Sequence, residues 1–192
     1  MQKGIALKYP HWQYFISLES SLNETTRYVE LSGNNYPVFS IEYARILLST
    51  ASEVDVVCKL LCTKIDSTAK AGNIDDYRKI ILSTYPKFPQ IKIQVPRLEI
   101  DISSWEDWGK DKNPEWWRNY NNVKHERGKY FEEANLKNSL FALSGLFAIL
   151  LYYYQVEAYK GDLHPFPRLI DYEKFPGYLI VSPGMELPDF PR

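Results

Sequence analysis

The segment from Trp116 to Arg127, WWRNYNNVKHER, holds the residues best suited to chemistry. Arg118 and His125 are seven residues apart, so on an ideal helix they differ by about 20° in direction and lie about 10.5 Å apart along the axis. Arginine offers a planar set of donors to phosphate oxygens, and histidine can take and give a proton near neutral pH. Together on one helix face, the two side chains suit a phosphodiester substrate, and we take them as candidate catalytic residues.

Four further polar residues are candidates for binding the same substrate, and they are Asn119, Asn121, Asn122 and Lys124. The first three offer amides, although Asn119 points about 100° away from Arg118 on an ideal helix. Positions 110–129 hold six basic and three acidic residues, a local balance of +3 in a chain of net charge −1. This favours a locally positive surface for an anionic partner such as RNA or a nucleotide. The competing interpretation is an ordinary solvated helix face.

Two carboxylates of another predicted helix, Glu53 and Asp55, are candidates for a supporting role. Being two residues apart, they point about 200° from each other and cannot both face one site. Asp55 lies nearer the apolar stripe, where a carboxylate needs a partner. We therefore favour it as the partner of a basic residue on the motif helix, namely Arg118, Lys124 or His125. A structural ion pair or a solvent-facing position is the alternative for both carboxylates.

Apolar periodicity and capping residues predict the helices that position these side chains. The predicted helices cover residues 10–31, 40–72, 73–86, 114–127 and about 136–154, with Asn113 as the N-cap of the fourth. Residues 86–113 alternate apolar and polar types around Pro96, which predicts two short strands or an extended loop. A proline-rich tail follows from about residue 160, with residues 178–181 as its strand-like piece. The expected fold is all-α, an up-and-down helical bundle in a single domain over residues 1–192.

Arg118-Asn119, followed by five residues and His125, resembles the motif of the HEPN (higher eukaryotes and prokaryotes nucleotide-binding) superfamily, in which an arginine, a polar residue, a spacer and a histidine follow one another. The resemblance covers about residues 10–156. It implies a metal-independent endoribonuclease of toxin or phage-defence systems, a homodimer with two motifs facing one cleft, and a 2′,3′-cyclic phosphate product. By the same resemblance, Arg118 stabilises the phosphate, His125 acts as general base or acid, and an antitoxin is a candidate partner. The 86–113 insertion and the tail depart from the compact form of the family.

Composition excludes several other classes of protein. Charge near zero argues against coating of nucleic acid or membrane by overall attraction, and two cysteines are too few for a disulfide scaffold. Cys58 and Cys62 have the spacing of two metal ligands but lack two more nearby, so we expect core cysteines, no metal and no cofactor. Residues 139–156 carry no charge, and we interpret them as a buried helix rather than a membrane span. Without a recognisable leader, we expect a cytoplasmic protein.

Two other classes of function stay open at this level. The same helix face could bind a nucleotide or RNA without cleaving it, as other HEPN-like proteins do by resemblance. The chain could also be an interaction protein in which the uncharged helix mediates assembly. Trp105, Trp108 and Trp117 are the aromatic residues that we single out as candidates for stacking on bases.

Overall fold

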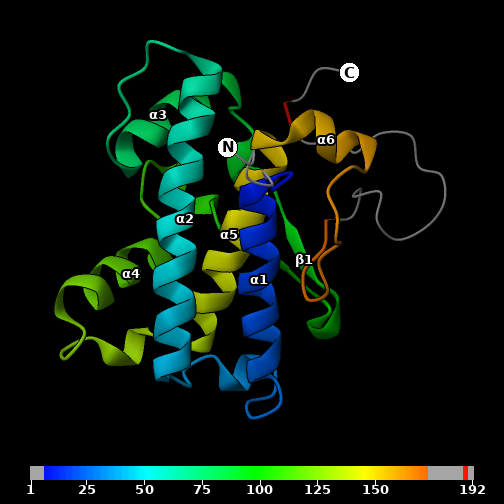
Figure 1. Ribbon diagram of the computed structural model, residues 1–192. Helices are drawn as coiled ribbons and strands as arrows, with labels where there is room; N and C mark the ends of the chain where they lie inside the picture. The colour runs from blue at the N-terminus through cyan, green and yellow to red at the C-terminus, as the bar shows by residue number, and fades with distance from the viewer. Residues whose placement is uncertain (1–6, 173–187, 190–192) are drawn as a thin grey trace, which may run out of the picture.

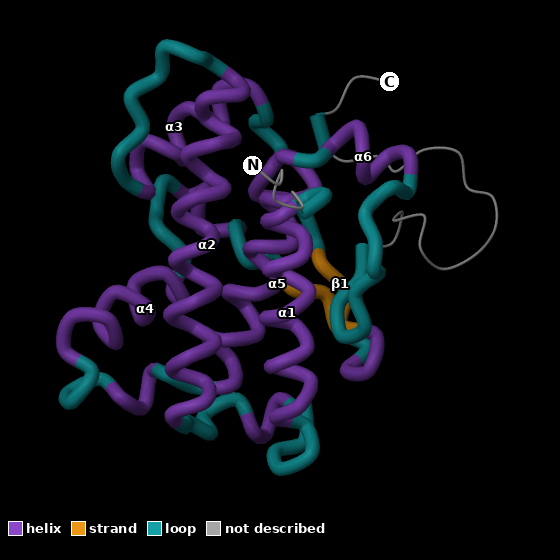
Figure 2. Tube along the Cα trace, in the orientation of Figure 1, coloured by secondary structure: helices purple, strands orange, loops and turns teal. Residues whose placement is uncertain are grey.

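The computed structural model describes residues 7–172 and 188–189, and this part of the chain is mostly helical with one small sheet (Figures 1 and 2). The helices are α1 (Pro10–Thr25), α2 (Ile41–Ile65), α3 (Ile74–Thr84), α4 (Glu115–Glu126), α5 (Leu136–Tyr153) and α6 (Gln155–Lys160). Strands β1 (Ile93–Val95) and β2 (Ile100–Ile102) pair antiparallel within the predicted insertion. The prediction of a mostly helical protein with a small β insertion is confirmed. The strand-like piece at 178–181 lies outside the described residues.

Helix α5 is the centre of the fold. It packs against α1, α2 and α4, and Figure 1 shows it running behind α1 and α2. Its sequence is long and apolar enough to cross a membrane, but 83% of that 18-residue window is buried inside the protein. Such burial is that of a core helix, because the apolar side chains are already covered by neighbouring helices.

Helices α1 and α2 are shorter than their apolar periodicity predicts. Helix α1 ends at Thr25, where the hydroxyls of Thr25 and Thr26 bond to backbone carbonyls of the preceding turn. Helix α2 ends at Ile65 because the carboxylate of Asp66 accepts hydrogen bonds from the backbone and hydroxyl of Thr68. Short polar side chains offer the backbone such local alternatives to a helix, which periodicity does not register.

The start of α4 differs from the predicted cap. Glu115 is its first helical residue, and Pro114 occupies the N-cap position in an extended conformation without a side-chain cap bond. Asn113, which we predicted as the cap, bonds to α3 instead, through Arg78 and Asp75. A neighbouring helix therefore fixes the beginning of α4, whereas Asn73 caps α3 and Asn135 caps α5 by the local bonds expected of asparagine.

A cluster of tryptophans anchors α4 against α5. The indole of Trp116 donates to the carbonyl of Ser104 at 2.9 Å, and that of Trp105 donates to the carbonyl of Gly145 at 3.0 Å. A Cβ at Gly145 would lie 3.0 Å from the Trp116 ring, so a larger residue there would require the ring to shift. Trp105, Trp108 and Trp117, which we singled out as candidates for stacking on bases, are 0%, 1% and 8% exposed and belong to the core.

The described part of the C-terminal segment is tied to α1 and to the sheet. The buried carboxylate of Glu19 accepts hydrogen bonds from the backbone N–H groups of residues 168–170, at distances from 2.8 to 3.3 Å. The indole of Trp12 donates to the carbonyl of Pro165, and Gln94 of β1 pairs with Asp171. These bonds hold the segment along the side of the helices that lies away from α4 (Figure 1).

Candidate nucleic-acid site on helix α4

Helix α4 divides into a buried side and an exposed side. Trp116, Tyr120 and Val123 are buried against the rest of the protein, at 2%, 6% and 1% exposure. Arg118 and His125 are both exposed. Because α4 is a regular helix over this span, residues seven apart leave it on the same side, opposite the buried residues. The two candidate catalytic side chains therefore share one solvent-facing surface, as their spacing predicts.

The guanidinium of Arg118 is turned back toward the beginning of its own helix. Its Nη1 donates to the carbonyl of Asn113 at 2.5 Å, and its other N–H groups have no partner within residues 7–172 and 188–189. The imidazole of His125 has no hydrogen-bond partner among the residues that the structure describes. One of the two side chains is thus held in place, and the other is available to solvent on both ring nitrogens.

A polar network that begins on α3 fixes the position of Asn113, whose carbonyl accepts the hydrogen bond from Arg118. Nη1 of Arg78 donates to the side-chain oxygen of Asn113 at 3.1 Å, and the amide of Asn113 donates to Asp75 at 3.2 Å. The guanidinium of Arg78 also lies 2.9 Å from Asp111 and 3.2 Å from Asp75. These contacts hold an Arg78 side chain that is only 10% exposed, while Asp75 and Asp111 lie at the surface, at 53% and 91% exposure. They connect α3 to the carbonyl that receives Arg118.

The side-chain amides of the motif asparagines donate hydrogen bonds to other groups of the protein. Asn119 donates to the side-chain oxygen of buried Asn138 at 3.3 Å, and Asn122 donates to Glu133 at 3.0 Å. Asn121 donates to a backbone carbonyl one turn earlier in α4, at 2.9 Å. The donors of Asn119 and Asn122 therefore tie α4 to α5 and to the short turn η5 (Phe131–Glu133), which corrects the expectation that they face the substrate.

Lys124 leans over an aromatic ring of its own helix. Its ammonium nitrogen lies 5.5 Å from the centre of the Tyr120 ring, and the side chain is exposed. The contact is a cation–π interaction that needs no carboxylate partner. Lys124 thus keeps its charge available beside the exposed surface of α4.

Glu53 and Asp55 do not join this site. Glu53 lies 2.6 Å from Nδ1 of His11, and Asp55 accepts from the hydroxyl of Tyr77 at 2.8 Å and from Lys59 at 2.5 Å. The prediction that Asp55 pairs with a basic residue of α4 is therefore wrong, because that part of α2 faces α3. Burial and the nearby Asp55 carboxylate raise the pKa of Tyr77 well above its ordinary value, so its hydroxyl stays a donor.

Several basic residues of positions 110–129 are not neutralised by carboxylates in the described part of the chain. Asp111 and Glu115 are within ion-pair distance of Arg78 and Lys137, both from outside the segment. Across the described part of the chain, four basic residues of the segment have no carboxylate within 4.0 Å, and these are Lys112, Arg118, Lys124 and Arg127. The segment therefore has cations available for an anionic ligand.

Neither of the two pockets that touch the ends of α4 contains the candidate catalytic pair. One is lined in part by Pro114, Glu115 and Trp116, and the other by Arg127 and residues of α2 and η5. Arg118 and His125 line neither of them. A cleft over Arg118 and His125 would therefore need a surface beyond the lining of these two pockets.

The described residues include no group of three histidine, cysteine or carboxylate side chains that could hold a metal ion. Cys58 and Cys62 are both buried and free, in agreement with the prediction of core cysteines. Burial raises the pKa of Cys62 to about 11 and that of Cys58 well above its ordinary value, so both remain thiols at neutral pH.

Comparison with known proteins found no family model, no curated protein and no solved structure that matches this chain.

Three residues of this region were not predicted from their sequence pattern to take part in the site, and they are Arg78, Asn113 and Arg127. Arg78 follows Asp75 by three residues, a spacing that indicates a helix-surface pair and gives no sign of its contact with Asn113. Asn113 before proline resembles a cap, which hides its use as a tertiary contact. Arg127 enters the sequence analysis as part of the charge balance, and only the structure places it in a pocket.

Proposed function

We propose that this chain is a metal-independent endoribonuclease of HEPN type, a single helical domain with the 86–113 insertion and the tail of about 160–192 as additions. The observation that carries the proposal is that Arg118 and His125 project from the same exposed side of α4, with no carboxylate neutralising either. The packing of α1, α2 and α4 around α5 is compatible with the up-and-down bundle that the HEPN resemblance implies.

In the proposed reaction, a ribose 2′-oxygen attacks the adjacent phosphorus while His125 takes the hydroxyl proton. The bond from the 2′-oxygen to phosphorus forms as the bond from phosphorus to the 5′-oxygen breaks, and a second histidine protonates that leaving oxygen. Arg118 binds the nonbridging oxygens, on which charge accumulates in the transition state. The products are a 2′,3′-cyclic phosphate and a free 5′-hydroxyl, and proton transfer of this kind contributes about 10²–10⁴-fold in rate.

A homodimer supplies the second histidine and the missing wall of the cleft. Two copies related by a two-fold axis through the exposed side of α4 bring two Arg118–His125 pairs together, because a two-fold interface presents the same surface from both subunits. Lys124 and the unused oxygen of Asn121 then lie at the rim and contact the RNA backbone. Asn119 and Asn122 support the site by holding α4 in place.

The proposed setting is a cytoplasmic toxin or phage-defence protein, with an antitoxin as a second partner and no membrane association. The burial of α5 is consistent with a soluble protein, because its apolar surface is covered within the chain.

The test is a cleavage assay with RNA in the presence of EDTA. Wild-type protein is compared with Arg118→Ala, His125→Ala and a matched control, Arg27→Ala, which removes an exposed arginine from the segment after α1. We expect cyclic-phosphate ends from wild type and the control, and a loss of at least about 10²-fold in rate for each motif variant. Dilution of the protein should lower the rate per chain, because a dimer dissociates.

Equal cleavage by all four proteins would contradict the proposal, and so would the absence of cleavage by wild type across a range of RNAs. RNA binding that Arg118→Ala abolishes, without any cyclic-phosphate product, would identify a binding protein in place of a nuclease.

A further inference from the structure

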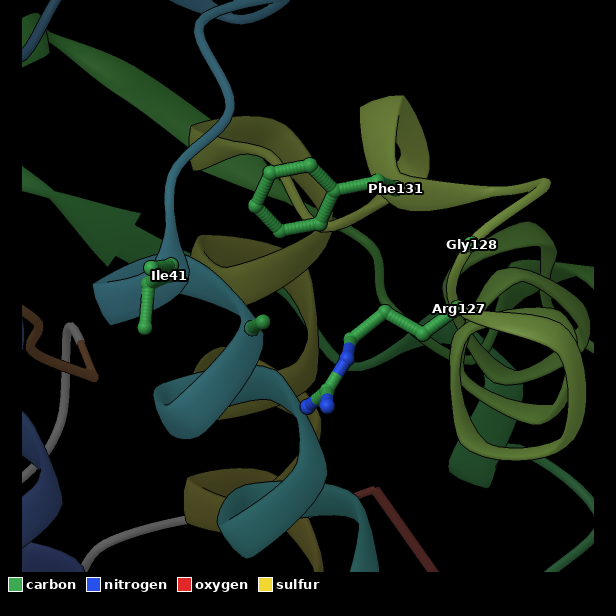
Figure 3. Close-up of a pocket in the computed structure, with 5 residues that line it drawn as sticks. Ile41, Arg127, Gly128 and Phe131 are labelled. Carbon is green, nitrogen blue, oxygen red and sulfur yellow. The ribbon is translucent and has the colours of Figure 1, made fainter.

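A pocket of about 390 Å³ opens where the beginning of α2 faces the end of α4 (Figure 3). It is lined by Ile41, Ala44, Arg127, Gly128 and Phe131. Its volume falls within the range of about 300–1,000 Å³ that small-molecule sites occupy. The pocket lies on the side of α4 that faces α2, because Arg127 follows His125 by two residues and so points about 200° away from it. It is thus separate from the surface that carries Arg118 and His125.

The walls of this pocket are apolar and in part exposed. Ile41, at the first position of α2, is 81% exposed. The ring of Phe131 is held on its other side by Phe39, at 5.3 Å between ring centres and nearly perpendicular. Ala44 completes the floor. Such a surface gains free energy when a flat apolar group covers it.

The charged group of this pocket is Arg127. Its guanidinium extends from the end of α4 toward α2, as Figure 3 shows. Within the described part of the chain it has no hydrogen-bond or ion-pair partner, and no carboxylate lines the pocket. A guanidinium binds phosphate through two parallel hydrogen bonds, and its plane also stacks on bases. The complementary ligand is an anion that carries a flat apolar group.

We propose that this pocket binds a nucleotide, with the base against Ile41 and Phe131 and the phosphate on Arg127. The choice of a nucleotide among such anions rests on the proposed function, since an RNA strand held on Arg118 and His125 can pass round the C-terminal end of α4. Another nucleotide of the same strand then enters the pocket. Contacts there add affinity for the strand and hold it in one register.

The test is calorimetric titration with adenosine 5′-monophosphate, using protein that carries His125→Ala so that cleavage plays no part. In that background, Arg127→Gln removes the cation and Ile41→Gln removes part of the apolar wall at an exposed position that the fold does not need. The matched controls are Arg27→Gln and Val156→Gln, which alter an exposed arginine and an exposed aliphatic residue elsewhere. Adenosine, inorganic phosphate and octanoate serve as further probes.

We expect each pocket variant to weaken nucleotide binding by about tenfold or more, because Arg127→Gln removes the charged donors and Ile41→Gln removes part of the apolar wall, and we expect the controls to leave it unchanged. Adenosine and phosphate alone should bind more weakly than the nucleotide. Tighter binding of octanoate than of the nucleotide, an effect of Arg127→Gln without one of Ile41→Gln, or no saturable nucleotide binding would each overturn the proposal. Failure of the nuclease proposal is seen separately, in the cleavage assay on His125.

Discussion

The amide of Asn119 connects the motif to the interior of the protein. Its donor goes to the side-chain oxygen of Asn138, which is 2% exposed and whose own amide donates to the carbonyl of Glu133 at 2.7 Å. A buried amide oxygen that loses its donor retains the penalty for leaving water. Asn119 therefore acts mainly on stability, although it sits directly beside Arg118 in the sequence.

We predict that Asn119→Ala lowers the free energy of unfolding by about 1–3 kcal/mol, because it leaves the Asn138 oxygen without its donor. Asn121→Ala is the matched control, since that amide bonds only to a carbonyl of its own helix, and a change within about 0.5 kcal/mol is expected for it. Urea unfolding followed by circular dichroism measures both. A loss of cleavage at full stability in Asn119→Ala would instead give this residue a role toward the substrate.

Helix α4 is placed by its neighbours as much as by its own sequence. Trp116 fills the notch at Gly145 of α5, and Asn113 is held by α3 through Arg78. The first turn of α4 has no side-chain cap, and the contacts of Arg78 with Asn113 fix the chain just before it. The position of Arg118 thus depends on a residue 40 positions earlier in the chain.

We predict that Arg78→Lys loosens the beginning of α4, because a lysine cannot contact Asp75, Asp111 and the Asn113 amide together. Hydrogen exchange measured by mass spectrometry should show faster exchange at residues 113–118, with little change in α1. Arg97→Lys is the matched control, as Arg97 forms an exposed ion pair with Glu30. Unchanged exchange at the start of α4 in Arg78→Lys would show that the tryptophans alone position this helix.

At the scale of the whole molecule, Glu19 joins the first helix to the C-terminal segment. Its carboxylate is 2% exposed and accepts from three successive backbone N–H groups. Burial raises the pKa of Glu19 above its ordinary value, and the hydrogen bonds from the backbone offset that effect only in part. The folded protein therefore binds a proton at this site more tightly than the unfolded chain does.

The sign of the resulting pH dependence follows from linkage. A raised folded-state pKa contributes stability that is fully present below the unfolded pKa, ordinarily 4.5, and is lost as pH rises through the folded value. We predict that the free energy of unfolding of wild type, relative to Glu19→Gln, decreases as pH rises from below 4.5 toward neutrality. Urea titrations at several pH values measure this, with Glu24→Gln on the same helix as the control. A relative stability that rises with pH would contradict the assigned direction.

The sequence by itself determined the existence of helices α1 to α5, the non-helical insertion between α3 and α4 and the common side of Arg118 and His125, because these follow from local periodicity and from the geometry of one regular helix. It did not determine the partners of Asp55, Glu53, Asn119 or Asn122, or the helix ends at Thr25 and Ile65. Those depend on which surfaces meet when distant segments pack, and on whether polar side chains form local or tertiary hydrogen bonds. Only the tertiary structure joins Ile41 to Arg127 in one pocket and Arg78 to Asn113 in one network, since residues far apart in the chain acquire a common environment only when the helices pack.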